Sequence, residues 1–260
     1  MSHYKAVQMY TVRDHVTDIP SLKDAFSKIA AIGYDAVQGW LIKDLEVEEY
    51  VDILNEYGLK ECSVGAGGMD SETAPIIKKA KALGVTEVGV GTLPQELTLT
   101  IEGFKKYAGQ LNTFGKRLYE DGGLSVSYHN HALEFASFNG TNGMEILFDE
   151  TDPKYVHFTL DTHWIACGGQ TPAKWIRRAA GRMPLVHFKD YAIIPGDFDM
   201  IEGVSKRFAE VGQGNIEWDD VVQACRDINV IFYIVEQDFC PASPFDSLKI
   251  SFDKLITLGL

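Results

Sequence analysis

Two histidines stand two residues apart in the stretch YHNHALEF at residues 128–135. The preceding residues 124–127 alternate like a short strand, so His129 and His131 are expected to point to the same face at its end. Glu134 follows closely. Paired imidazoles beside a carboxylate suit a metal site or acid–base chemistry, although one buried and one solvated histidine would explain the same stretch.

Three later strand-like segments also deliver a histidine or a carboxylate. These residues are Asp161 after residues 155–160, His187 within residues 184–188 and Glu236 after residues 230–235. At the ends of neighbouring strands in a parallel barrel, such side chains converge at one edge. A set of His, Asp, His and Glu suits a borderline or hard divalent ion such as Mn²⁺, Zn²⁺ or Co²⁺, and it needs no thiolate.

The elements that would position these residues alternate between strands and helices. The expected strands cover residues 6–12, 36–41, 60–64, 85–90, 124–128, 155–160, 184–188 and 230–235. The expected helices cover residues 21–32, 46–57, 75–83, 101–119, 143–148, 172–180, 218–228 and 247–258, and residues 193–215 are expected to be irregular. Helical spacing of apolar residues, with glycines such as Gly33 and Gly58 as stops, supports the helix assignments.

Eight strand–helix units in 260 residues predict an α/β fold, a parallel (β/α)₈ TIM barrel that forms one domain over residues 1–260. An open doubly wound sheet is the structural alternative. A nucleotide-binding sheet would carry a Gly-rich turn after its first strand, and residues 11–15 (TVRDH) contain no glycine. The GAGG run at residues 65–68 lacks the Lys-Ser/Thr ending of a phosphate loop, so we interpret it as a flexible loop.

Charge and composition limit the partners. The 24 basic and 37 acidic residues give a net charge of −13, which disfavours nucleic acid and anionic lipid as partners. No apolar run reaches membrane-spanning length, and the N-terminal residues do not resemble a signal peptide. The four cysteines form no C-x-x-C pair, so we expect a cytoplasmic protein without a disulfide framework. The sequence leaves a homo-oligomer open.

Several segments carry a family resemblance. YHNHALEF, LDTHWIACGG, PLVHFKDY, VGQGNIEW and IVEQDFC resemble the xylose isomerase-like barrel family, and especially its branch described as sugar phosphate isomerases/epimerases. The opening VQMYTVRD and the closing SLKISFDKL are similar as well, so the resemblance runs nearly end to end. It implies a TIM barrel with one divalent ion (Mn²⁺, Zn²⁺, Co²⁺ or Mg²⁺) at the ends of its fifth to eighth strands.

The resemblance also implies the ligands of that ion. The family's ligands from its last three strands fall on Asp161, His187 and Glu236. The fifth-strand ligand of the family is usually the Glu of a Glu-x-His pattern, and this chain has His129 there. The resemblance therefore leaves either His129 or Glu134 as the fourth ligand.

Roles in catalysis can be argued from the residues, because His129 stands where many relatives have one Glu of an acid/base pair. A metal ion next to a sugar carbonyl would polarise its oxygen and stabilise an enediolate, while a base moves the proton on the adjacent carbon. Glu236 could be the base, while His131, which matches a substrate-facing position of the family, and His163 could relay protons. Lys189 could hold a developing oxyanion or pair with a neighbouring acid. The residues expected to contact substrate are Tyr10, Arg13, Gln38, Trp40, Glu134 and Trp164, although the aromatic ones could simply pack at the barrel top.

The preferred function is a divalent-metal-dependent sugar isomerase or epimerase. The main alternative is a lyase or hydratase that acts on 3-keto-glycosides by β-elimination, because the first proton abstraction is shared. A non-catalytic sugar-binding subunit would not need the His, Asp, His and Glu set, and a DNA-repair endonuclease would need a basic groove.

We also predict that the substrate carries no strongly bound phosphate. A barrel phosphate site would lie in the loops after the last two strands, but these contain acids such as Asp190 and Asp238, and no Gly-rich nest follows the last strand. Arg13 is the residue that could overturn this prediction, because a guanidinium can fork onto a phosphate.

Overall fold

The computed structural model describes residues 3–42, 44–91, 93–199 and 203–260. Its main sheet is parallel and has the order β3-β2-β1-β13-β10-β9-β6-β5-β4. The strands are β1 (Tyr4–Gln8), β2 (Ala36–Gln38), β3 (Lys60–Glu61), β4 (Val64–Gly65), β5 (Glu87–Val90), β6 (Ser125–His129), β9 (Val156–Asp161), β10 (Leu185–Phe188) and β13 (Phe232–Val235). Only two residues separate β3 from β4, so both belong to one stave and the sheet closes into the predicted eight-stave barrel.

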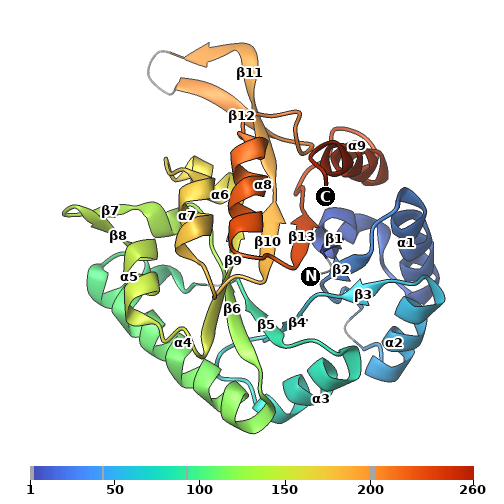
Figure 1. Ribbon diagram of the computed structural model, residues 1–260, viewed down its shortest axis with the longest axis horizontal. Coiled ribbons are helices and arrows are strands. Elements are labelled where there is room, and N and C mark those ends of the chain that lie inside the picture. Colours follow the sequence, from blue (N-terminus) through green and yellow to red (C-terminus); the bar gives the residue numbers. More distant parts are fainter. Residues whose placement is uncertain (1–2, 43, 92, 200–202) are drawn as a thin grey trace.

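Helices surround the strands, as Figure 1 shows. They are α1 (Ile19–Ile32), α2 (Val47–Glu56), α3 (Thr73–Leu83), α4 (Ile101–Gly122), α5 (Gly143–Glu150), α6 (Thr162–Cys167), α7 (Pro172–Arg178), α8 (Trp218–Asp227) and α9 (Pro244–Thr257). Local chemistry sets their ends. At α4, the Thr100 side chain accepts a hydrogen bond from the Gly103 N–H at 3.0 Å, and Gly123 ends the helix at φ 70°.

The core lies between the barrel and the helix ring. Phe104, Leu111 and Leu118 on α4 are completely buried, as are Val126 and Tyr128 on the adjoining strand β6. Each such side chain contributes about 1.5–3 kcal/mol by leaving water. Helical spacing on α4 and strand alternation on β6 therefore fix which residues of β6 face the helices and which face the barrel interior.

Two parts of the chain differ from the predicted elements. Strand β1 ends at Gln8, and Met9–His15 form a 3₁₀ helix, η1, because the Gln8 side chain accepts a hydrogen bond from the Tyr10 N–H at 3.3 Å. The prediction of an irregular segment over residues 193–215 is wrong for much of its length. Strands β11 (Asp190–Asp199) and β12 (Gly203–Ala209) form an antiparallel hairpin that projects from the barrel (Figure 1).

Three short elements were also absent from the sequence prediction. They are helix α6 and the two strands β7 (Ser137–Phe138) and β8 (Thr141–Asn142), which form a small hairpin. Each is six residues or shorter, too short to show a hydrophobic period.

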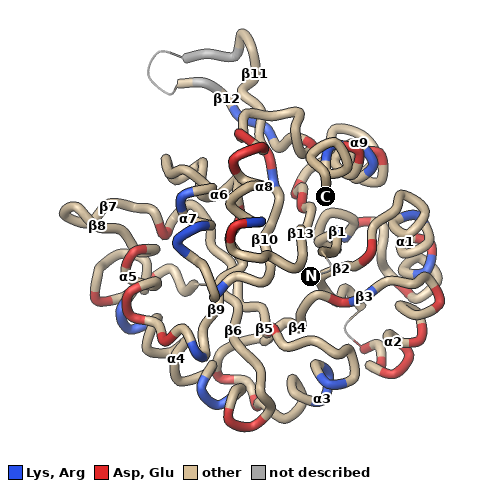
Figure 2. The backbone as a smooth tube through the Cα atoms, in the orientation of Figure 1, with Lys and Arg blue, Asp and Glu red and all other residues tan. Residues whose placement is uncertain are grey.

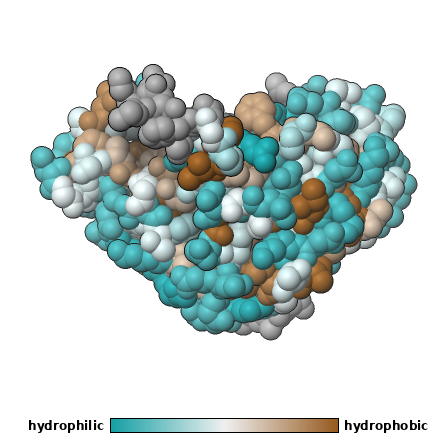
Figure 3. All heavy atoms as spheres, turned by 90° about the horizontal axis from the view of Figure 1, so that it is seen from above, coloured by the Kyte–Doolittle hydropathy of each residue, from teal (hydrophilic) through white to brown (hydrophobic). Residues whose placement is uncertain are grey.

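The surface is charged but not uniformly so. In Figure 2, acidic residues dominate α2, whereas basic residues gather on α3 and along parts of α4. The face drawn in Figure 3 is mostly hydrophilic, with separate small hydrophobic patches. Among the described residues, no helix combines the length and the apolar character that a membrane crossing requires.

Candidate active site

Four side chains of the kinds that bind metal ions meet at the carboxyl end of the barrel. His129 ends β6, Asp161 ends β9, His187 lies in β10 and Glu236 directly follows β13. These strands are neighbours in the sheet, and the register places His187 beside Asp161. One ligand atom from each of the four residues lies within 4.8 Å of the others. Strand order therefore brings residues that are distant in the sequence to one point.

His187 is held at both of its ring nitrogens. Its Nδ1 lies 2.9 Å from Oε2 of Glu236, and its Nε2 lies 2.6 Å from Oε1 of Gln38. Gln38 Oε1 also accepts a hydrogen bond from Gln8 Nε2 at 2.8 Å, and Gln38 Nε2 donates to Oγ of Ser63 at 2.9 Å. This amide network fixes the ring so that Nδ1 faces the cluster, the arrangement that second-shell partners impose on metal-binding histidines.

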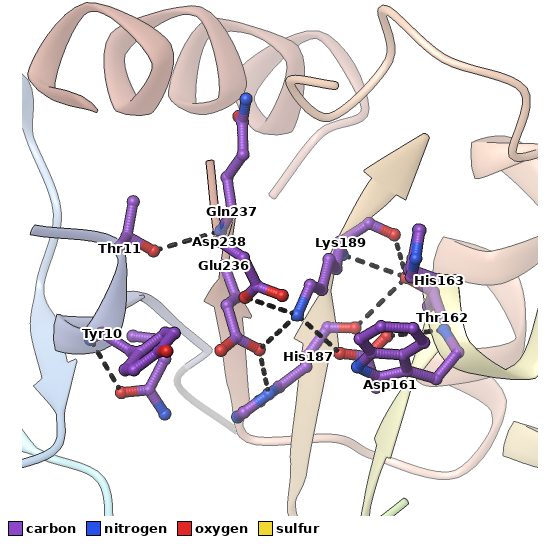
Figure 4. A network of polar contacts seen from close by, with 12 residues as sticks. Tyr10, Thr11, Asp161, Thr162, His163, His187, Lys189, Glu236, Gln237 and Asp238 are labelled. Carbon is purple, nitrogen blue, oxygen red and sulfur yellow. Dashed lines mark hydrogen bonds and ion pairs between the residues drawn. The ribbon is translucent and has the colours of Figure 1, made fainter. Parts of the chain in front are cut away.

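Lys189 adds a buried cation beside the cluster, as Figure 4 shows. The side chain is 2% exposed, and its Nζ donates a hydrogen bond to Asp238 Oδ1 at 2.8 Å. The same Nζ lies 3.5 Å from Glu236 Oε2 and 3.9 Å from Asp161 Oδ2. Burial disfavours the charged ammonium, but the three carboxylates around it outweigh burial and raise the Lys189 pKa.

Burial and neighbouring charges divide the cluster into different protonation states. Burial raises the pKa of Asp161 to about 7, and the nearby charge of Glu236 adds to the rise. Burial acts on Glu236 in the same direction, but His187 and Lys189 outweigh it and lower the Glu236 pKa. Burial, with help from His187, lowers the His129 pKa well below its usual value, so this imidazole is neutral, the form that coordinates metals.

The residues present fit a divalent ion. His129 Nδ1 and Asp161 Oδ2 are buried polar atoms that have no hydrogen-bond partner in the described part of the chain, a costly arrangement unless something else contacts them. Glu236 and Asp238 outnumber the one buried cation, Lys189, even when Asp161 is protonated. This excess of carboxylate and the two buried ligand atoms without a hydrogen-bond partner describe a site that could hold a divalent metal ion.

A cavity of about 490 Å³ opens over the cluster. Its lining includes three of the four cluster residues, His129, His187 and Glu236, together with His131 and Tyr10. The remaining polar lining is neutral and consists of Gln8, Gln38, Ser63, Ser127 and Thr159. Amides and hydroxyls that accompany the ionisable groups in the lining match a hydroxyl-rich, uncharged ligand.

Of the residues predicted to contact substrate or move protons, the structure brings Tyr10, Gln38 and His131 to this cavity. Tyr10 is 49% exposed at its mouth. The His131 ring lies 4.9 Å from that of His129, and burial together with Lys189 lowers its pKa, so it is neutral at pH 7. A neutral imidazole at this place can accept or pass on a proton.

Trp40 lies outside the cavity lining. Its ring stacks on Tyr50 at 4.4 Å, and its Nε1 donates to the carbonyl of Ile42 at 2.6 Å. The prediction assumed that Trp40 shares a strand face with Gln38. Gly39 has φ 108°, which ends the strand and turns the tryptophan toward the outer helices.

Glu134 is also directed away from the cluster. It is completely buried, accepts a hydrogen bond from the Tyr128 hydroxyl, and accepts one from the His131 N–H at 3.0 Å. Burial raises its pKa to about 7. The structure therefore groups His129, not Glu134, with Asp161 and the other ligands. The carboxylate of Glu134 instead fixes the turn that presents His131.

Arg13 is anchored to backbone near the rim. It donates hydrogen bonds to the carbonyls of Tyr10 at 2.8 Å and of Asp238 at 2.9 Å, and it stacks over the Tyr10 ring at 4.0 Å. Asp238 is also the hydrogen-bond partner of Lys189, so Arg13 holds the segment that carries this partner. Arg13 therefore links the segment that follows the first strand of the barrel to the segment that follows the last.

His163 and Trp164 lie under the β11–β12 hairpin on helix α6. The Trp164 ring is 5.0 Å from Lys189 Nζ, and Phe208 of the hairpin lies 5.2 Å from the same atom. His163 Nε2 contacts Cys167 Sγ at 3.4 Å, and burial lowers the His163 pKa to about 4. Trp164 and Phe208 thus contact the Lys189 ammonium. Neither they nor His163 belong to the cavity lining.

Some site residues had not been singled out from the sequence. Ser127 and Thr159 precede His129 and Asp161 by two residues, so strand alternation would have placed them on the same inward face. Asp190 is buried and accepts hydrogen bonds from backbone N–H groups of residues 212–216 and from the Trp218 ring, which gives the VGQGNIEW segment its fold. Phe208 had no local signal, because only the hairpin brings it here.

The fold and the site define an enzyme-like TIM barrel whose ligand set lies at the carboxyl ends of four adjacent strands. The family model described as xylose isomerase-like TIM barrel matches residues 26–238, and the chain belongs to this family. The family resemblance expected from the sequence is thereby confirmed.

Individual relatives are more distant. Inosose dehydratase 2 of Bacillus cereus is 31% identical over 157 residues, which cover 56% of this chain and 52% of that protein. The chain thus spans about half the length of the curated relatives it matches. Among solved structures, a sugar phosphate isomerase/epimerase from Parabacteroides distasonis has a TM-score of 0.77 at 21% identity, covering 98% of this chain and 94% of the other.

A second solved structure carries a metal. The IolI protein with a bound zinc atom has a TM-score of 0.70 at 16% identity, and the match covers 98% of this chain and 97% of that one. At these identities both solved structures bear on the fold alone.

Proposed function

We propose that this protein is a divalent-metal-dependent enzyme that removes a proton from the carbon next to a carbonyl group of a sugar or related polyol. The observation that carries the proposal is the cluster of His129, Asp161, His187 and Glu236 beneath a cavity whose other polar walls are amides and hydroxyls. The structurally similar IolI protein was solved with a bound zinc atom, which is consistent with a metal ion in this fold.

The four clustered residues would hold the ion, which, when bound, supplies Lewis-acid polarisation of the substrate carbonyl. Glu236 is the proposed base. Its Oε2 lies 2.9 Å from His187 Nδ1, its pKa is lowered so that it is ionised, and the residue lines the cavity. It is therefore ready to take a proton from a carbon seated above the cluster.

Lys189 and His131 are proposed to handle the charge and the proton that result. The Lys189 ammonium stays charged among its carboxylates and stabilises negative charge that develops on oxygen. His131 is neutral and lines the cavity, so it can carry a proton between two positions of the substrate. Return of the proton to the neighbouring carbon completes an isomerisation, and return to the same carbon from the other face completes an epimerisation.

A dehydratase is the second candidate, and the curated relatives favour it, because those at 29–31% identity are named inosose dehydratases. The same base would remove the proton next to the carbonyl, the electron pair would form a carbon–carbon double bond, and the hydroxyl on the next carbon would leave as water after protonation. A 3-keto-glycoside would lose its glycosidic group in the same way. Both outcomes share the Glu236 step.

Proton exchange in D₂O tests the proposal. Protein loaded with Mn²⁺, Zn²⁺, Co²⁺ or Mg²⁺ is incubated with keto-sugars, a ketone of inositol and 3-keto-glycosides, and the products are followed by NMR. We expect deuterium at the carbon next to the carbonyl, with either an isomer or an eliminated product. Absence of both exchange and product across the whole panel would refute the proposal.

A further inference from the structure

A second and larger cavity adjoins the site. It has a volume of about 710 Å³ and lies between the loop at residues 65–70 and the exposed face of α4. It shares four lining residues with the cavity over the cluster, namely Gly65, Gly89, Val90 and Gly91. We call this second cavity the α4 groove. These shared residues show that the two cavities adjoin, so a ligand that is long enough to extend from the cluster could reach the α4 groove.

Glycines line the region where the two cavities adjoin. A Cβ built on Gly91 would lie 3.6 Å from Cδ2 of the His129 ring, so the start of the α4 groove is in contact distance of the ligand cluster. A Cβ built on Gly65 would meet nothing within 4 Å. The GAGG run, interpreted from the sequence as a flexible loop, thus forms part of the groove wall.

The helical wall of the α4 groove also keeps a glycine. Gly109 lies in the interior of α4, where glycine costs about 1 kcal/mol relative to alanine. A Cβ built there would meet nothing within 4 Å, so packing does not demand the glycine. Its absent side chain leaves room in the groove instead.

The charge of the α4 groove differs from that of the protein as a whole. Lys106 and Arg117 line it from α4, and Asp70 lines it from the loop. Neither cation forms an ion pair with a carboxylate anywhere in the described part of the chain, although Arg117 donates a hydrogen bond to the Ser71 carbonyl at 3.4 Å. Both cations line the cavity and are therefore available to bind an anionic ligand, although the chain as a whole has a net charge of −13.

Neutral polar groups accompany the two cations. Gln110 and Thr113 lie on the same face of α4, between Lys106 and Arg117, and both line the groove. Amide and hydroxyl groups next to unpaired cations suit a sugar unit that carries an acidic group.

We infer that the α4 groove binds the distal, anionic unit of an extended sugar ligand whose other end lies over the metal-ligating cluster. The inference rests on the proposed function for the sugar end. The anion can be a carboxylate or a phosphate, since Lys106 and Arg117 bind either. A phosphate here would lie beside the third and fourth staves, away from the acidic loops after the seventh and eighth staves where the sequence argues against one.

Three β-1,4-linked disaccharides test the inference: cellobiose, its uronic acid analogue cellobiouronate, and cellobiose 6′-phosphate. They differ only at the distal sixth carbon, and calorimetric titration of the metal-loaded protein measures their binding without turnover. We expect cellobiouronate or the phosphate to bind at least tenfold more tightly than cellobiose, and the tighter of the two identifies the anion. Added salt should reduce this difference in affinity, because salt screens the charge of exposed cations.

Substitutions test whether the tighter binding of the anionic disaccharides arises in the α4 groove. Lys106→Glu should reduce the ratio of anionic to neutral affinity by about tenfold or more, whereas Lys105→Glu, the same charge change at an exposed neighbour outside the lining, should leave the ratio unchanged. Gly109→Trp should lower the affinity for all three disaccharides relative to Gly109→Ala, because the indole fills the space that glycine leaves.

Two results would overturn the inference. One is equal or undetectable binding of the anionic and neutral disaccharides to the parent protein. The other is an equal effect of Lys106→Glu and Lys105→Glu on the affinity ratio. Loss of deuterium exchange in the NMR assay, with the binding preference intact, would instead count against the proposed function alone.

Discussion

Replacement of Lys189 by methionine tests how the buried charges of the site balance one another. The change keeps most of the side-chain volume and removes the ammonium that lies 2.8 Å from Asp238, 3.5 Å from Glu236 and 3.9 Å from Asp161. Removal of one partner from a buried charge network costs about 3–5 kcal/mol. In a domain of this size, that loss lowers the melting temperature by roughly 6–20 °C.

The sign of the pH dependence follows from the carboxylates left behind. Lys189 lowers the pKa of Asp161 and of Glu236, so its removal raises both folded-state pKa values and favours protonated carboxyl groups in the folded variant. The stability deficit of Lys189→Met should therefore be smallest near pH 4–5 and grow as the pH rises toward 8. A divalent ion should restore stability, because it supplies the positive charge that the variant lacks.

Thermal unfolding followed by circular dichroism checks this prediction at pH 5 and pH 7.5, in chelator and with added Mn²⁺ or Zn²⁺. Lys105→Met is the matched control, since Lys105 is exposed and should change stability by less than about 0.5 kcal/mol. If Lys189→Met melts with the parent in chelator at pH 7.5, the charge argument fails. If the ion raises its melting temperature no more than that of the parent, the metal part of the argument fails.

Three further predictions address the cluster and the barrel. Asp161→Ala and His187→Ala should each lose bound metal by elemental analysis, and unchanged stoichiometry in both would contradict the ligand assignment. Glu236→Gln should lower kcat by about 10² or more while the circular dichroism spectrum stays unchanged; activity within a few-fold of the parent would exclude Glu236 as the base. Burial raises the pKa of Glu61 from 4.5 to about 7. Below pH 4.5 the carboxyl group is protonated in both the folded and the unfolded protein, and the folded protein loses stability as the pH rises toward 7 and above, because burial opposes ionisation of Glu61. Glu61→Gln should therefore stabilise the protein by about 3 kcal/mol at pH 8 and hardly at pH 4.5, as measured by urea unfolding; an equal effect at both pH values would refute this.

The barrel could be predicted because local signals repeat along the chain. Glycines end helices at Gly33, Gly84 and Gly123, each with positive φ, and apolar periodicity marks the helix faces. The β11–β12 hairpin gave no such signal, because Pro195 and Gly196 interrupt its first strand and few of the hairpin side chains that the structure describes are buried. A strand pair that projects from the core does not need alternating hydrophobic residues.

The site was predictable where strand alternation controls side-chain direction and not elsewhere. His129 ends β6, and the positions of Asp161 and His187 follow from strand order. Trp40 follows a glycine with φ 108°, and Glu134 lies in a 3₁₀ turn, so neither keeps the direction that alternation assigns. Side chains beyond a strand's last residue depend on turn geometry, which a single sequence specifies weakly.

The placement of Lys189 explains why a site this acidic can form before an ion arrives. Glu236, Asp161 and Asp238 would repel one another if all were ionised in the folded chain without any cation. One buried ammonium, together with protonation at Asp161, whose pKa lies at about 7, removes most of that repulsion. A divalent ion that binds here would replace a proton and would leave the Lys189 ion pairs in place, so metal binding would stabilise a barrel that is already folded. The same arrangement keeps the lysine close to the cluster, where it can oppose charge that develops on a substrate oxygen.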